Sequence, residues 1–284
     1  MGESVANVLI VGCGKIGFGL AAALSGSGHS VTGLKRTPLA VPPPFPLLLN
    51  DITRPLSSAS IPTDYDLVVF AVSADSRQHE HYQALYETGL NNVLNHFAEA
   101  GATPPFLMVS STSVYGQNGG EWVDEGSSTQ PASATAQWLV KAEQRLWQAG
   151  ERNCVVRFSG IYGPGRDWLL RRAAAGEAIQ RDPPSYTNRI HQDDCLAVLL
   201  FLIGKMLDGT KLDPCYLASD NDPAPLWDVM TWIAAQFGYP PPQALPTALD
   251  VPQNKRCSNA RLNALGYRWL YPSYKDGYLP PYSA

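Results

Sequence analysis

The residues with the clearest chemical role are three glycines near the N-terminus, in the segment Gly12-Cys13-Gly14-Lys15-Ile16-Gly17. This G-x-G-x-x-G spacing falls between an apolar run at Val8–Val11, expected to be a strand, and a small-residue segment at Ile16–Leu24, expected to be a helix. In that context the spacing is typical of dinucleotide binding. Gly12 would allow a tight turn, Gly14 would let a pyrophosphate approach the backbone, and Gly17 would let the helix pack on the strand. With the N–H groups of the helix N-terminus, the pattern predicts a phosphate-binding loop; the alternative is a glycine-rich turn without a ligand.

A second candidate follows the next apolar run, Val31–Leu34, which ends in Lys35 and Arg36. An acidic residue near this point holds the ribose 2′-hydroxyl of NAD, whereas an arginine accommodates the 2′-phosphate of NADP. The strand end carries no acid, and a guanidinium matches phosphate geometry. The sequence therefore favours NADP over NAD, with Arg36 as a ligand. The alternative is that both basic residues are merely solvated at a strand end.

Other catalytic chemistries find little support. The hydroxyl run Ser110–Ser113 lacks the G-x-S-x-G context of a hydrolase nucleophile. His79 and His81 lie two residues apart and would not share a helix face, so no metal site is predicted. The five cysteines include no C-x-x-C pair and their number is odd. This usage does not indicate a disulfide framework and favours a reducing, cytoplasmic setting.

The composition is that of a globular protein, with 284 residues of which 45% are hydrophobic. A soft prior of ~150 residues per domain gives about two domains. Lys and Arg number 21 against 25 Asp and Glu, for a net charge of −4, which argues against binding to a nucleic acid backbone. No apolar run approaches the ~20 residues of a membrane span, and the N-terminus lacks the pattern of a signal peptide. We therefore expect a small-molecule substrate, with no nucleic acid and no membrane as partner.

The elements that would position these residues alternate between strand and helix. The expected strands are Val8–Val11, Val31–Leu34, Leu67–Val72, Phe106–Val109 and Cys154–Phe158. The expected helices are Ile16–Leu24, Leu85–Ala100 and Ala134–Ala149. Apolar strands that alternate with helices predict an α/β fold, a Rossmann-like doubly wound parallel sheet covered on both faces. Ligands of such a sheet bind at the carboxyl ends of its strands.

The rhythm breaks after Gly160, where proline-rich connections become frequent. Tyr216–Ala218 is expected to be one more strand, and Leu196–Ile203, Leu226–Phe237 and Ala260–Leu265 are expected to be helices. We interpret residues 1–165 as the NAD(P)-binding Rossmann domain and 166–284 as a smaller C-terminal substrate region. Parts of 186–220 are expected to return to the Rossmann sheet.

Four segments in this order resemble the extended short-chain dehydrogenase/reductase superfamily, in particular its NAD-dependent epimerase/dehydratase family. They are the glycine loop, Val109-Ser110-Ser111-Thr112-Ser113-Val114-Tyr115-Gly116, Arg157-Phe158-Ser159-Gly160-Ile161-Tyr162-Gly163-Pro164-Gly165-Arg166, and Arg189-Ile190-His191-Gln192-Asp193-Asp194. Each segment alone is common, but the combination is specific. The tail, with Asn254–Arg256 and Leu265–Tyr267, is similar to a subgroup of small atypical members.

The resemblance implies roles for further residues at the cofactor. Asp51 and Ile52 match the pair that contacts adenine, and Ala71 and Val72 match the loop beside the adenine ribose. Lys141 falls at the lysine of the family's Y-x-x-x-K motif and would bind the nicotinamide ribose. Tyr162 would pass close to the nicotinamide.

The resemblance also implies a substrate site and a dimer. Ser111 falls at the catalytic Ser/Thr position and, with Thr112, would bind a substrate oxygen. Arg189 and His191 would line the rim of the substrate region. The substrate would be a small polar molecule such as a sugar or a sugar nucleotide. A homodimer would form through the helices Leu85–Ala100 and Ala134–Ala149.

Two departures from the family pattern matter. The first two glycines are separated by one residue fewer than in most extended members, which cofactor binding tolerates. More seriously, Gln137 stands four residues before Lys141, where the family has its catalytic tyrosine. The family lysine lowers the pKa of that phenol so that it can exchange a proton with substrate, whereas a carboxamide has no titratable proton.

The missing tyrosine leaves several hypotheses open. Another group could supply the proton, and the candidates by segment are Tyr115, Tyr162, Tyr186 and His191. Trp138, beside Gln137, could form a wall of the nicotinamide pocket. The leading hypothesis is an NAD(P)-dependent epimerase/dehydratase-like oxidoreductase in which Ser111, Lys141 and Gln137 form the catalytic group. The alternative is a non-catalytic dinucleotide-binding sensor or structural module.

Overall fold

The computed structural model describes residues 5–57, 59–245 and 253–279. These residues fall into two compact units, which are described separately. The first unit lies within 1–114, 132–156 and 196–216, and the second lies within 115–131, 157–195 and 217–284. Within the described ranges, every helix is too short or too polar to span a membrane.

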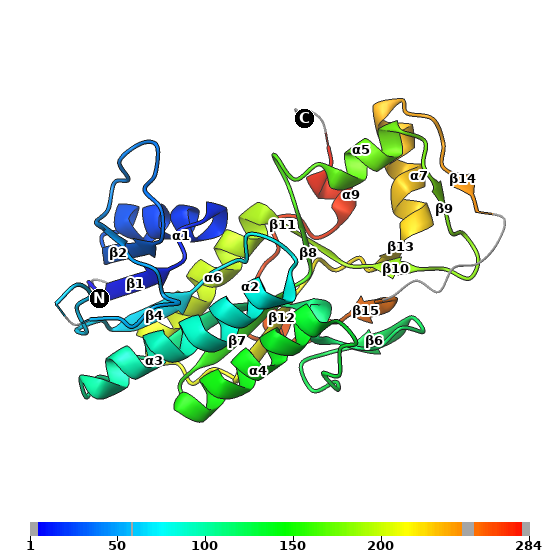
Figure 1. Cartoon of the computed structure of the whole chain (residues 1–284). Helices are drawn as coiled ribbons and strands as arrows, with labels where there is room; N and C mark the ends of the chain where they lie inside the picture. The colour runs from blue at the N-terminus through cyan, green and yellow to red at the C-terminus, as the bar shows by residue number, and fades with distance from the viewer. Residues whose placement is uncertain (1–4, 58, 246–252, 280–284) are drawn as a thin grey trace. The chain divides into compact units, whose positions relative to one another are not determined.

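A seven-stranded sheet, in the order β12-β7-β5-β4-β1-β2-β3, is the main feature of the fold (Figure 1). Its strands are β1 Asn7–Val11, β2 Ser30–Lys35, β3 Leu47–Leu49, β4 Leu67–Phe70, β5 Phe106–Ser111, β7 Cys154–Phe158 and β12 Cys215–Ala218. The pairs from β5 across to β3 are parallel. From β1 the chain order runs outwards in both directions, so the switch point lies between β1 and β4. The predicted doubly wound α/β fold is confirmed.

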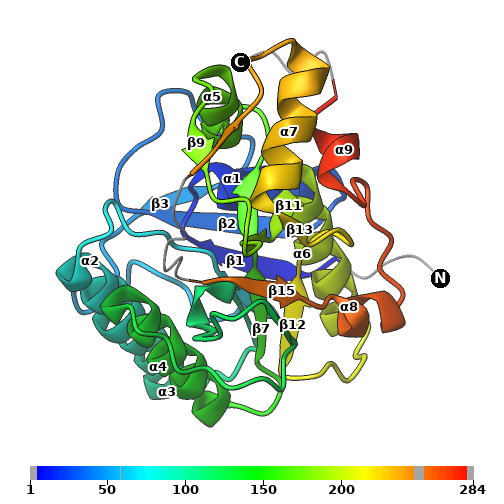
Figure 2. The same cartoon turned by 90° about the vertical axis from the view of Figure 1, so that its right-hand side faces the viewer.

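Helices cover both faces of the sheet in the first unit. They are α1 Lys15–Gly26, α2 His79–Gln83, η1 Ala84–Gly89, α3 Leu90–Glu99 and α4 Ala134–Ala149, together with most of α6 Gln192–Leu207. In both views α2, α3 and α4 lie together on one face, and α1 lies on the other (Figures 1 and 2). The strands β1, β4, β7 and β12 are almost fully buried, which explains their continuous apolar sequences.

Several elements differ from their predicted bounds. The single helix predicted at Leu85–Ala100 begins earlier, at His79, and contains the π-helical turn η1. The first turn of this helix, from His79, is polar, so apolar periodicity could not predict it. Gly89 at the end of η1 packs against Ile52, since a Cβ there would meet Ile52 Cδ1 at 2.9 Å. Strand β3 was not predicted because it has only three residues, none of them buried, after a proline-rich segment.

The second unit consists of short strand pairs around its own apolar cluster. Its strands are β6 Glu121–Val123, β8 Gly160–Tyr162, β9 Ala178–Ile179, β10 Tyr186–Thr187, β11 Arg189–His191, β13 Ala224–Pro225, β14 Gln243–Ala244 and β15 Lys255–Cys257. Its helices are α5 Trp168–Ala174, α7 Leu226–Phe237, α8 Ala260–Ala264 and α9 Tyr274–Gly277. The cluster joins α5, α7 and α9 through side chains such as Leu170, Ile233 and Tyr278. This unit also contains residues 115–131 and 157–165.

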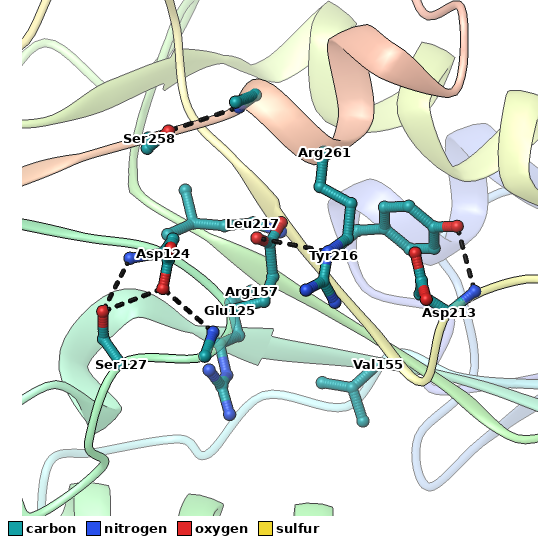
Figure 3. Close-up of polar contacts among 12 residues, drawn as sticks. Asp124, Glu125, Ser127, Val155, Arg157, Asp213, Tyr216, Leu217, Ser258 and Arg261 are labelled. Atoms are coloured by element: carbon teal, nitrogen blue, oxygen red, sulfur yellow. Dashed lines mark hydrogen bonds and ion pairs between the residues drawn. The ribbon is translucent and has the colours of Figure 1, made fainter.

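A buried carboxylate in the second unit, that of Glu125, binds the backbone of Leu217 (Figure 3). Glu125 Oε1 accepts a hydrogen bond from the backbone N–H of Leu217 at 2.7 Å. Its other oxygen lies 3.5 Å from Arg261 Nε. Burial raises the pKa of Glu125, and these two partners oppose that rise. Because Leu217 lies in the edge strand β12, the contact occupies a backbone donor that would otherwise be open to pairing with another strand.

Candidate functional site

An open pocket with a cavity volume of about 190 Å³ lies in the first unit, at the carboxyl ends of β1, β2 and β4. This is the switch point of the sheet, where ligands of such folds bind. The pocket is lined by Val11, Gly12, Cys13, Gly14, Leu34, Lys35, Arg36, Thr37, Asn50, Asp51, Ile52, Ala71, Val72, Ser73, Asp75 and Leu85. It therefore brings together the glycine loop, Arg36, the adenine pair and the ribose loop that the sequence singled out.

The three glycines of the loop differ in what requires them. Gly12 has a φ of +98°, and a Cβ there would meet the Ala71 carbonyl oxygen at 2.7 Å. A Cβ on Gly17 would collide with the Gly12 carbonyl oxygen. Gly14, in contrast, has a φ of −74°, and a Cβ there would meet nothing within 4 Å. The fold itself therefore requires Gly12 and Gly17, whereas Gly14 leaves free space in the pocket.

The N-terminus of α1 adjoins that space. Gly14 is its N-cap residue and, as a glycine, has no side chain that could cap the helix end. Lys15 is exposed and Ile16 half-buried, and neither lines the pocket. The N-terminus of such a helix carries the partial positive charge that favours an anion.

Cys13 serves packing in the loop. Its side chain is buried and its Sγ donates a hydrogen bond to the Ile10 carbonyl oxygen at 3.7 Å. A Cβ on Gly33 of β2 would meet that sulfur at 2.6 Å. Burial raises the pKa of Cys13 to about 11, so the thiol stays protonated.

Charged residues gather at the β2 end of the pocket. Arg36 Nη2 donates to Asp75 Oδ2 at 2.6 Å. Asp51 Oδ1 accepts hydrogen bonds from the backbone N–H and the hydroxyl of Thr53, at 3.0 and 2.8 Å. Burial alone would raise the pKa of Asp51, but these bonds and the charges of Arg36 and Arg54 lower it. Sequence reasoning missed Asp75, although its position just after the expected strand Leu67–Val72 is a signal for this edge of the sheet.

Ser111 is the last residue of β5, and its neighbour Ser110 forms a hydrogen bond with helix α4. The Ser110 hydroxyl donates to Glu143 Oε1 at 2.6 Å, and both residues are buried. Ser111 Oγ accepts the backbone N–H of Ser113 at 3.1 Å, and Thr112 is buried. The contact from Ser110 shows which face of α4 meets β5.

Gln137 and Lys141 lie on other parts of the surface of α4 than Glu143. Residues four apart share a helix face, so Leu139 and Thr135 follow Glu143 along it, whereas Lys141 lies about 200° around the helix from Glu143. Gln137 and Lys141 are both exposed, and Leu139 is buried. The contact of Ser110 with Glu143 therefore does not involve the exposed positions Gln137 and Lys141.

Lys141 and Trp138 instead belong to a contact between α4 and α2. The Lys141 ammonium lies 3.9 Å from the centroid of the Trp138 ring. The Trp138 indole N–H donates to His79 Nε2 at 2.9 Å, and Trp138 itself is buried. Trp138 is thus packed between helices and does not form a wall of the described pocket. Nothing in the sequence links His79 to it, since the two lie 59 residues apart.

Three predicted residues of the second unit are buried within that unit. Tyr162 belongs to its apolar cluster. His191 lies between Tyr162 and Tyr271, with ring centroids 5.2 and 3.9 Å apart, and burial lowers its pKa. Arg189 Nη2 donates to the carbonyl and hydroxyl oxygens of Thr187. β11 pairs with β8, and both Arg189 and His191 are buried within the second unit.

The other proton-donor candidates also have structural contacts. The Tyr115 hydroxyl accepts a hydrogen bond from Arg157 Nη1 at 2.9 Å, and its side chain is buried. Tyr186 is half-buried beneath the Arg256 guanidinium, which lies 4.8 Å from its ring centroid. No group of three metal-binding side chains occurs among the described residues.

Comparison with known proteins agrees with this geometry. The model of the NAD-dependent epimerase/dehydratase family matches residues 8–209. The chain belongs to that family. A solved structure from Methylobacillus flagellatus, provisionally assigned as an NAD-dependent epimerase/dehydratase, is 35% identical over 97% of both chains, with a TM-score of 0.79.

Two curated relatives are more distant. Protein YeeZ of Escherichia coli is 27% identical over 275 residues, which cover 94% of this chain and 96% of the relative. A 3-diazoavenalumate denitrifying reductase of a Streptomyces species is 24% identical over 163 residues. That match covers 51% of this chain and 52% of the reductase, about half of each.

Proposed function

We propose that this member of the family is an NADP-binding, epimerase/dehydratase-like oxidoreductase of small polar substrates, a class that includes sugars and sugar nucleotides. The observation that carries the dinucleotide is the free space at Gly14 beside the N-terminus of α1. The protein's own packing does not require a glycine there, whereas close approach of a pyrophosphate does.

The residues around the pocket suit each part of a dinucleotide. The N–H groups at the start of α1 would bind the pyrophosphate. Asp51 and Ile52 would contact the adenine, Ala71 and Val72 would flank its ribose, and Arg36 would bind the 2′-phosphate. When bound, the nicotinamide supplies hydride transfer. Ser111, exposed in part at the end of β5, would hold a substrate oxygen by its hydroxyl.

Gln137 favours a second candidate, a dinucleotide-binding module without turnover, because it stands four residues before Lys141, where the family has its catalytic tyrosine. Gln137 cannot exchange a proton, and Lys141 is exposed. A panel of nucleotide sugars incubated with the loaded protein and followed by NMR separates the two. Epimerised or dehydrated product would exclude the module, and its absence across the panel would favour it.

The dinucleotide assignment can be tested with two alanine variants of the same helix. Gly14→Ala and Gly26→Ala each place a methyl group in open space, but only Gly14 lines the pocket. We expect both variants to fold with wild-type secondary structure. We expect NADP to bind wild type and Gly26→Ala alike, and to bind Gly14→Ala at least about tenfold more weakly, a loss of ~1.4 kcal/mol.

The measurement is the ligand-induced rise in Tm, with Kd values from calorimetry. A ligand at ~100 times its Kd adds about 2.7 kcal/mol to the free energy of unfolding, which for a chain of this size raises Tm by several degrees. Wild-type affinity retained by Gly14→Ala would contradict the proposed pocket. A lack of any shift with NAD, NADH, NADP and NADPH would contradict dinucleotide binding altogether.

A further inference from the structure

The Arg36–Asp75 ion pair stands at the part of the pocket where the ribose of a dinucleotide would lie. The two side chains approach to 2.6 Å, and both residues line the pocket. Arg36 follows β2 and Asp75 lies in the loop after β4, so the pair crosses the switch point of the sheet. The hydrogen bond from Arg36 lowers the pKa of Asp75, so Asp75 is a carboxylate at neutral pH.

Among the charged residues at the β2 end of the pocket, Arg36 and Asp75 are the pair that can exchange partners. Lys35 and Arg36 are the cations that line it, and Asp51 and Asp75 are the anions. Asp51 is engaged with Thr53, whereas the carboxylate of Asp75 is held by a side chain that is itself half-exposed. The side chains of Arg36 and Asp75 are 53% and 63% exposed, so both can exchange partners without unpacking the core.

We infer that Asp75 is a specificity-determining residue for the ribose 2′ position, because it competes with a 2′-phosphate for Arg36 and offers its own carboxylate to a 2′-hydroxyl. The inference rests on the proposed dinucleotide site. A 2′-phosphate carries close to two negative charges at neutral pH. It would have to replace Asp75 on the Arg36 guanidinium and would be repelled by the displaced carboxylate. A neutral 2′-hydroxyl can donate to Asp75 and leave the ion pair intact.

This arrangement gives the pocket an acid that the end of β2 lacks. In the usual dinucleotide site the acid at the strand end favours NAD, and an arginine there favours NADP. In this pocket an acid, Asp75, and an arginine, Arg36, are both present, and they bind each other. Asp75 therefore weakens the binding of a 2′-phosphate to Arg36 and supports the binding of a 2′-hydroxyl, so the protein accepts both NADP and NAD.

The test is the ratio of the Kd for NAD to the Kd for NADP, measured by calorimetry in wild type, Asp75→Asn and the double variant Arg36→Gln/Asp75→Asn. Removing the carboxylate charge frees Arg36, so we expect the ratio to rise about tenfold in Asp75→Asn through tighter binding of NADP. The gain should disappear in the double variant. Asp182→Asn serves as the matched control, because it removes another exposed aspartate that contacts an arginine, Arg181 at 2.8 Å.

The outcomes separate this inference from the proposed function. An unchanged or lower ratio in Asp75→Asn, with either dinucleotide bound, would overturn the role of Asp75 and leave the dinucleotide site standing. A gain that persists without Arg36, or that also occurs in Asp182→Asn, would likewise overturn it. If neither dinucleotide binds any of the proteins, the proposed function fails and this inference fails with it.

Discussion

Asp220 has a carboxyl group in the interior of the second unit, where only 1% of the residue is exposed. Burial raises its pKa to about 7, although the positive charge of Arg189 and a hydrogen bond from the Asp222 backbone oppose that rise. Its Oδ2 has no hydrogen-bond partner among the described residues. The carboxyl group is therefore mostly neutral below pH 7 in the folded chain, whereas in the unfolded chain it ionises near its ordinary value of 3.8.

The displaced pKa predicts how stability depends on pH. Between about pH 4 and pH 7 the folded state binds a proton that the unfolded state has released, so this group makes stability fall as pH rises, by up to about 1.4 kcal/mol per pH unit. Asp220→Asn removes that dependence. We expect the difference in the free energy of unfolding between wild type and variant to change across this window in favour of the variant. Urea titrations at a series of pH values measure it.

The control for this prediction is Asp228→Asn, at an exposed position. It should retain the wild-type dependence on pH. A constant difference between wild type and Asp220→Asn from pH 4 to pH 7 would show that Asp220 titrates alike in both states.

Single residues were predictable from sequence where a local backbone rule applied. Gly12 and Gly17 were assigned to a turn and a close helix–strand contact, and the structure shows both. The partners in contacts between distant segments could not be predicted, as with Asp75 on Arg36 and His79 on Trp138. Among the tyrosine and histidine candidates, Tyr162 and His191 pack against aromatic residues near the C-terminus, which no motif indicated.

At the scale of elements, helix α4 was predicted well. Its bounds Ala134–Ala149 followed correctly from apolar periodicity. Spacing within a motif does not fix the rotation of a helix against a strand, so the contact between Ser110 and Glu143 could not be predicted from the sequence.

The contact of Lys141 with Trp138 predicts that removal of the ammonium has little effect on cofactor binding. Lys141→Ala should leave the Kd for NADP within about twofold of wild type, because its ammonium already lies over the Trp138 ring. An exposed cation–π contact contributes only about 0.5–1 kcal/mol, so the fall in stability should also be small. Calorimetric titration measures the Kd, and Gly14→Ala measured in the same way serves as the reference for impaired binding. A tenfold loss in Lys141→Ala would mean that the ammonium does reach the cofactor.

At the scale of the whole molecule, the alternation of apolar strands and helices was enough to predict the large sheet. Each of its strands except β3 carries a run that is buried on both sides, which is a strong signal. The second unit was described only as a smaller substrate region. Its strands have two or three residues, and pairs such as β15 with β6 join segments more than 130 residues apart. Such short strands have too little periodicity to be recognised, and their pairing depends on the finished fold.

The homodimer implied by the resemblance would need an exposed apolar surface on α3 and α4. It would pair α3 and α4 with their copies, and a stable interface of standard size buries about 800 Å² per partner around a largely apolar centre. The apolar residues of these helices are already used inside the chain, including Val93, Phe97 and Leu146. The exposed positions of α4 from Gln137 to Gln148 are polar, and no large exposed hydrophobic side chain among the described residues lies on either helix.

We therefore expect a monomer of 30.8 kDa in solution across the micromolar range. Sedimentation velocity at several loading concentrations measures the mass directly. If the mass doubles, Gln144→Glu on the exposed face of α4 locates the contact, because two copies related by a twofold axis would bring the added charges close together. Dissociation of that variant would show that a polar helix face suffices for dimerisation here. A dimer that persists would place the contact elsewhere, and the exposed Trp122 and Trp168 of the second unit would then be the next positions to alter.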